Sequence, residues 1–135
     1  MDLDALQKSQ LVRQRVLLVE DDPQGAQLLK MVLEDLGVIE VVHAGDGQQA
    51  WDAFSVASDP FTVVISDWNM PGMTGLQLLE KVRAVSRTIP FIMITGRGLI
   101  DSAVEAKTHG VTAYISKPYT PQQIVSKLLG VIDKE

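Results

Sequence analysis

The 135-residue sequence contains no cysteine, which excludes disulfide bonds, thiolate catalysis and cysteine-ligated metal sites. It also has no apolar run that approaches the roughly 20 residues of a membrane-spanning helix. Its first ten residues, MDLDALQKSQ, lack the basic start and the apolar core of a signal peptide. We therefore expect a cytoplasmic protein that does not contact a membrane.

Positive charge is scarce as well. Against 17 Asp and Glu there are only 12 Lys and Arg, which gives a net charge of -5 and a pI near 4.9. Such a chain repels a phosphate backbone on average, so we expect no nucleic-acid partner. Repeats, low-complexity tracts and linkers are missing too. Length and 46% apolar content predict one domain over 15–135, after a lead-in over 1–14 that is either frayed or a short helix.

Short apolar runs alternate with segments of helical periodicity along the rest of the chain. Strands are expected at Arg15–Glu20, Val38–His43, Phe61–Ser66, Phe91–Thr95 and Thr112–Ser116. Apolar residues at helical spacing predict five helices, over Leu28–Leu36, Ala50–Ala57, Leu76–Val85, about Leu99–His109 and Ile124–Ile132. Asp22 before Pro23 is expected to cap the first of these helices.

This alternation predicts an α/β fold, a doubly wound parallel sheet of five strands with five helices. A flavodoxin-like strand order, 2-1-3-4-5, is expected for such a unit. In open sheets of this kind, ligands bind at the carboxyl edge, where the strand order reverses. Here the reversal falls between the first and the third strand, and both of these strands end in acids.

Four of the five predicted strands end on chemically useful groups. These are Glu20 and Asp21 after the first strand, Asp67 after the third, Thr95 after the fourth and Lys117 after the fifth. Each group alone has an ordinary interpretation, as a solvated helix start, a turn residue, a strand-terminal hydroxyl or a surface lysine. The two histidines, His43 and His109, are expected to be structural. The functional prediction depends on the conjunction of these groups at one edge.

Three clustered carboxylates predict a cation. Two unit charges about 4 Å apart cost roughly 4 kcal/mol at an effective dielectric constant near 20, so the cluster keeps a proton or recruits an ion. Oxygen ligands favour a hard ion such as Mg²⁺. Beside it, Asp67 could attack a phosphorus atom, while Lys117 and Thr95 meet the phosphoryl oxygens. The predicted product is an aspartyl phosphate.

The segments VLLVEDD, VVISDWNMPGMTG, FIMITG and AYISKP occur in the order found in the receiver domain of two-component response regulators, which the chain resembles over about Val16–Asp133. It looks most like the single-domain chemotaxis regulators of CheY type. The resemblance implies that Asp67 accepts a phosphoryl group from a sensor histidine kinase. It further implies that Asp21 binds Mg²⁺ directly, that Glu20 does so through water, and that the backbone carbonyl of Asn69 completes the metal shell.

Other roles are carried over by motif position. The resemblance implies that Thr95 is a switch hydroxyl, Tyr114 an aromatic switch and Lys117 a phosphoryl-binding lysine before a cis Pro118. Arg97 and Asn69 occupy positions that tune phosphoryl lifetime, and with a cation at Arg97 we hypothesise slow dephosphorylation. Glu20 stands where many relatives have aspartate, which puts only the water-mediated part of the metal shell in question.

The output is expected at a protein surface. Phosphorylation would reshape the face made by the fourth helix, fifth strand and fifth helix, where a separate output or phosphotransfer protein docks on a monomer. A phosphorelay shuttle or phosphate sink on the same chemistry stays open. A scaffold that does not use phosphate, a hydrolase and a flavin or nucleotide binder are less favoured. The hydrolases usually carry an aspartate where Asn69 stands, and the loop EDDP would repel a nucleotide phosphate.

Overall fold

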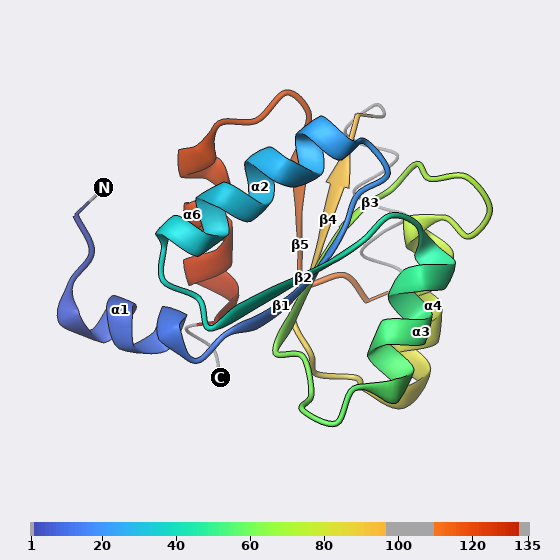
Figure 1. The fold of residues 1–135 in the computed structure, drawn as a ribbon, viewed down its shortest axis with the longest axis horizontal. Helices are drawn as coiled ribbons and strands as arrows, with labels where there is room; N and C mark the ends of the chain where they lie inside the picture. The colour runs from blue at the N-terminus through green and yellow to red at the C-terminus, as the bar shows by residue number, and fades with distance from the viewer. Residues whose placement is uncertain (1, 97–109, 133–135) are drawn as a thin grey trace.

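Five parallel strands form one sheet at the centre of the computed structural model, which describes residues 2–96 and 110–132 (Figure 1). The strands are β1 (Arg15–Val19), β2 (Glu40–Ala44), β3 (Val63–Asp67), β4 (Phe91–Thr95) and β5 (Ala113–Ser116). Their order is β2-β1-β3-β4-β5, and each neighbouring pair is parallel. The predicted fold class and strand order are confirmed.

Helices cover both faces of this sheet. They are α1 (Ala5–Val12), α2 (Pro23–Asp35), α3 (Gly47–Val56), α4 (Gly75–Val85) and α6 (Pro121–Ile132). Figure 1 shows α2 and α6 on one face and α3 with α4 on the other. The helix expected at about Leu99–His109 lies outside the described residues. No helix in the described ranges is both long and apolar enough to cross a lipid bilayer.

The core consists of two apolar layers separated by the sheet. On β1, Leu17 points into the layer under α3 and α4, and Leu18 points into the layer under α2 and α6. Val64 and Ile65 divide between the same two layers on β3. Because both faces are covered, consecutive positions in the middle of these strands, Val16–Val19 on β1 and Val63–Ile65 on β3, are apolar rather than every second one. This explains why the sequence shows continuous apolar runs instead of alternation.

Side-chain caps fix where the helices begin. Asp22 accepts a hydrogen bond from the backbone N–H of Gly25, as predicted, so α2 starts directly after the acidic run. Asp46 likewise accepts from the N–H of Gln49 at the start of α3. The side chain of Gln49 reaches Gly45 rather than the N–H of Asp46, so only half of a capping box forms there.

The lead-in is a capped helix that docks against the amino edge of the sheet. Leu11 of α1 is fully buried in the layer under α2 and α6. Gln14 is buried as well, and its side-chain oxygen accepts a hydrogen bond of 2.7 Å from the hydroxyl of Thr62. The hydroxyl of Thr62 also accepts a hydrogen bond from the N–H of Arg15, so a side chain takes the place of a strand partner there. The β3 strand therefore begins at Val63 rather than at Phe61 as predicted.

Candidate functional site

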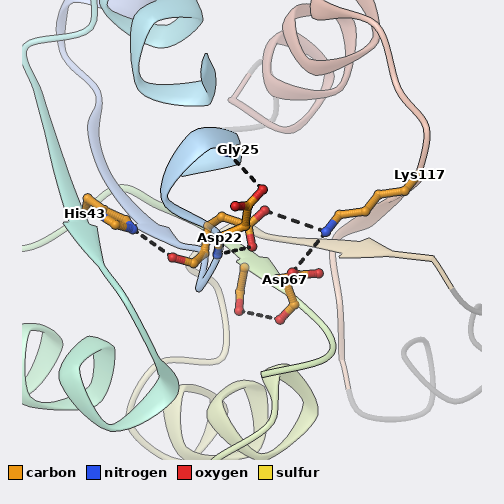
Figure 2. A network of polar contacts seen from close by, with 7 residues as sticks. Asp22, Gly25, His43, Asp67 and Lys117 are labelled. Carbon is orange, nitrogen blue, oxygen red and sulfur yellow. Dashed lines mark hydrogen bonds and ion pairs between the residues drawn. The ribbon is translucent and has the colours of Figure 1, made fainter. Parts of the chain in front are cut away.

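The carboxyl ends of three strands bring three ionisable groups together. Asp67 is the last residue of β3, Glu20 follows β1 and Lys117 follows β5. Although both carboxylates are charged groups, Glu20 is only 3% exposed and Asp67 only 5% exposed. Figure 2 shows Lys117 reaching across the edge toward Asp67. The structure thus joins residues that are fifty positions apart in the sequence.

Lys117 bridges the two buried acids. Its Nζ donates a hydrogen bond of 3.0 Å to Oδ2 of Asp67 and lies 3.6 Å from Oε1 of Glu20. Burial lowers the pKa of Lys117, but the hydrogen bond and charge of Asp67 and the charge of Glu20 raise it above its ordinary value overall. The ammonium therefore stays charged beside one oxygen of Asp67.

Three carboxylates form a group with the geometry of a metal site. Glu20, Asp21 and Asp67 each offer one oxygen, and these oxygens all lie within 4.8 Å of one another. Asp21 is exposed, so the group opens to solvent on its side. One lysine leaves this cluster short of positive charge, and an all-oxygen donor set suits a hard divalent cation. The residues present fit Mg²⁺.

The pKa of Glu20 responds to burial and to the neighbouring acid. It is raised from 4.5 to about 7, chiefly by burial and then by the hydrogen bond and charge of Asp67. The charge of Lys117 and the backbone N–H of Asp22 oppose the rise. Near neutral pH, Glu20 is therefore present in both its protonated and its ionised form. A bound cation would stabilise the ionised form.

This raised pKa predicts how the metal-free protein responds to pH. Below pH 4.5 Glu20 carries a proton whether the chain is folded or unfolded, whereas between pH 4.5 and about 7 only the folded chain holds it. Stability conferred by the folded protein's tighter proton binding is therefore lost as pH rises through that window, by about 3 kcal/mol. Urea unfolding in EDTA across this range should show a flatter profile for Glu20→Gln, which keeps the volume without titrating. Parallel profiles for the two proteins would contradict the assignment.

Thr95 and Tyr114 occupy the adjoining strands. Thr95 ends β4 with 1% exposure, and its carbonyl accepts a hydrogen bond of 2.8 Å from the N–H of Lys117. Tyr114 lies on β5, packs against the layer under α3 and α4, and lines a cavity of ≈ 380 Å³ with Pro118 and Lys127. The Lys117–Pro118 peptide bond is cis. The switch roles of Thr95 and Tyr114 stay predictions.

Two further positions named by the resemblance are less defined by the structure. Asn69 is exposed two residues after Asp67, and the role of its carbonyl in a metal shell stays a prediction. Arg97, to which we assigned control of phosphoryl lifetime, lies outside the described residues, as does His109.

A cavity opens beside Glu20 and Lys117, and the sequence analysis did not identify Tyr119 as part of its wall. It has a volume of ≈ 560 Å³ and is lined by Glu20, Asp22, Gly25, Leu28, Gly96, Lys117, Pro118 and Tyr119. Burial raises the pKa of Tyr119, and the charge of Glu20 raises it further. The phenol thus stays neutral beside the acids. The position of Tyr119 directly after Lys117 and Pro118 was the one feature of the sequence that could have placed it at this site.

His43 reaches this edge of the sheet, where sequence analysis did not place it. The prediction treated it as structural because it did not fall at the predicted catalytic edge. In the structure its Nε2 lies 2.8 Å from the backbone carbonyl oxygen of Glu20 (Figure 2). A contact between a side chain and a distant backbone carbonyl leaves no trace in residue spacing.

Known proteins resemble this chain over most of its length. Residues 16–129 match the family described as response regulator receiver domain. The chemotaxis protein CheY1 of Helicobacter pylori is 41% identical over 116 residues, which is 84% of this chain and 93% of that protein. The chemotaxis protein CheY of Pseudomonas aeruginosa is 35% identical over 122 residues, or 89% of this chain and 97% of the relative.

A solved structure shows the same architecture. The chemotaxis protein CheY4 of Vibrio cholerae superimposes with a TM-score of 0.81 at 34% identity, covering 88% of this chain and 98% of the other. The match therefore extends over nearly the whole of that relative.

Proposed function

Because this chain belongs to the response regulator receiver family, we propose that Asp67 accepts a phosphoryl group from a sensor histidine kinase in a reaction that requires Mg²⁺. The observation that supports this most directly is the environment of one side chain. Asp67 faces the Lys117 ammonium at 3.0 Å through one oxygen and belongs to the three-carboxylate group of Glu20, Asp21 and Asp67. A nucleophile held between a fixed cation and a metal-binding group suits phosphoryl transfer.

Each residue has a separate task in this reaction. An oxygen of Asp67 forms the new bond to phosphorus while the bond from phosphorus to the donor's imidazole nitrogen breaks, and the imidazole leaves with the electron pair. Lys117 offsets charge on the phosphoryl oxygens, and the hydroxyl of Thr95 donates to one of them. Asp21, Asp67 and the carbonyl of Asn69 would hold Mg²⁺, with Glu20 acting through water. The bound ion would supply further positive charge.

The phosphoryl group then acts as a switch. A hydroxyl drawn inward at Thr95 vacates space for the ring of Tyr114, which changes the surface around β5 and α6. A partner that binds the new surface more tightly stabilises the phosphorylated state by the same factor. The protein is thus a signalling regulator, with self-phosphorylation and autodephosphorylation as its own chemistry.

The relatives support a chemotaxis pathway. CheY1 and CheY of the organisms above are chemotaxis proteins, so we place this chain in a chemotaxis-type response in the cytoplasm, as a monomer that docks on a separate output protein. A phosphorelay shuttle or sink would use the same Asp67 chemistry. Transfer of the phosphoryl group from this protein to a histidine of another protein distinguishes that alternative.

The chemistry is tested with a small phosphodonor. Incubation with acetyl phosphate and MgCl₂ should add the mass of one phosphoryl group to the intact protein, and excess EDTA should abolish the addition because the carboxylate group then lacks its cation. The adduct should be cleaved by hydroxylamine, which attacks an acyl phosphate. An unchanged mass in Mg²⁺, or an equal mass gain in EDTA, would count against the proposal.

A further inference from the structure

The peptide group between Glu20 and Asp21 is held from the edge strand. At the end of β1, the N–H of Glu20 donates 3.1 Å to the carbonyl of Ala44, which extends the pairing with β2 by one bond. The carbonyl of Glu20 is held differently, by Nε2 of His43 at 2.8 Å (Figure 2). A carbonyl oxygen only accepts, so Nε2 carries the hydrogen and the imidazole is the donor.

This contact fixes more than one residue. The carbonyl of Glu20 and the N–H of Asp21 belong to one planar peptide group, so the bond that holds the carbonyl also sets where the Asp21 backbone starts. On the far side, Asp22 is held by its cap on Gly25, and its N–H lies 3.4 Å from Oε2 of Glu20. Asp21 is exposed and lies outside both β1 and α2. Its backbone is therefore held on one side by the carbonyl of Glu20 and on the other by Asp22.

From this geometry we propose that His43 is a positioning residue for the metal site, which holds the Glu20–Asp21 peptide so that both carboxylates face Asp67. The inference rests on the proposed function, since it concerns the Mg²⁺ that the phosphoryl transfer requires. His43 is not one of the three acids of the metal-binding group. It acts through the backbone, as partners of metal ligands commonly do.

The experiment is a Mg²⁺ titration of the metal-free protein, measured by isothermal titration calorimetry. His43→Phe keeps a ring of similar size and high strand propensity but has no donor, and it should weaken Mg²⁺ binding by roughly 5-fold. His43→Val lacks a donor too and should weaken binding equally. His43→Gln places an amide N–H at the same number of bonds from Cα, so it should bind Mg²⁺ within about twofold of the wild type.

A spectroscopic readout separates positioning from general damage. In ¹H–¹⁵N spectra of the metal-free proteins, the Asp21 amide should shift in His43→Phe and return toward its wild-type position in His43→Gln. Urea unfolding in EDTA should show a cooperative transition for every variant, because the His43 side chain is exposed and its replacement does not disturb the core.

The outcomes divide cleanly. Wild-type affinity in His43→Phe, or an affinity in His43→Gln as weak as in His43→Phe, would overturn the role of His43 while leaving the proposed function intact. Failure of the wild-type protein itself to bind Mg²⁺ would instead overturn the proposed function.

Discussion

The Asp67→Asn protein should incorporate no detectable phosphoryl group from acetyl phosphate and MgCl₂, a loss in rate of roughly a thousandfold or more. A neutral amide is a poor nucleophile toward phosphorus, and the substitution also removes one of the three metal-binding oxygens. The loss of negative charge further releases Lys117 from its 3.0 Å hydrogen-bonded ion pair. Intact mass spectrometry over a time course measures the rate directly.

Asp22→Asn is the matched control for this substitution. Asp22 lies in the same acidic run but caps α2 instead of joining the carboxylate group, and asparagine caps a helix about as well as aspartate. This variant should become phosphorylated at close to the wild-type rate. Incorporation by Asp67→Asn at that rate would place the phosphoryl group on another acid.

A second readout shows whether Asp67→Asn alters the site as expected rather than unfolding it. The hydrogen bond and charge of Asp67 contribute to the raised pKa of Glu20. Without them the pKa of Glu20 should fall toward its ordinary value, so the metal-free variant should lose less stability than the wild type as pH rises from 4.5 to 7.

The fold could be predicted from the sequence because its apolar strand runs are clear and alternate regularly with helical segments. Consecutive apolar residues such as Val63–Ile65 are expected in a strand when both of its faces are covered, which favours a parallel sheet. Parallel strands direct all their carboxyl ends to one edge, and so Asp67 and Lys117 could be predicted to lie together without any local signal linking them. The acids and the lysine of the candidate site followed from topology.

What sequence analysis left open depends on contacts that spacing does not encode. His43 contacts a backbone carbonyl, and a carbonyl exists at every residue of the chain. The lead-in over 1–14 shows no clean helical period beyond Leu3, Leu6 and Leu11, so a frayed segment and a short helix both stayed open. In the structure it is a helix, whose Leu11 enters the core, and Gln14 after it pairs with Thr62.

Gly75→Ala should destabilise the protein by about 3 kcal/mol, since close packing leaves no room for even one added methyl group. Gly75 is the first residue of α4, and its N–H donates 2.9 Å to the carbonyl of Trp68. A Cβ there would collide with the carbonyl oxygen of Asp67, and it would lie 2.9 Å from Sδ of Met93 and 3.0 Å from Cα of Trp68. Two of these three atoms are backbone atoms at the end of β3, so relief requires either α4 or the strand that carries Asp67 to move. Urea unfolding measures the loss, and weaker Mg²⁺ binding by the folded fraction would show that the strand had moved.

Gly130→Ala provides the control with the opposite expected sign. Gly130 lies in α6, is exposed, and would meet no atom within 4 Å if it carried a Cβ. Alanine there restricts the unfolded chain and favours the helix, so it should stabilise the protein by roughly 0.5–1 kcal/mol. If Gly75→Ala also raised stability, the approach of α4 to Asp67 would be looser than the structure shows. Opposite signs would establish that glycine at residue 75 is required by contact with the strand end and not by helix formation, and hence that the start of α4 is part of what holds Asp67 in place.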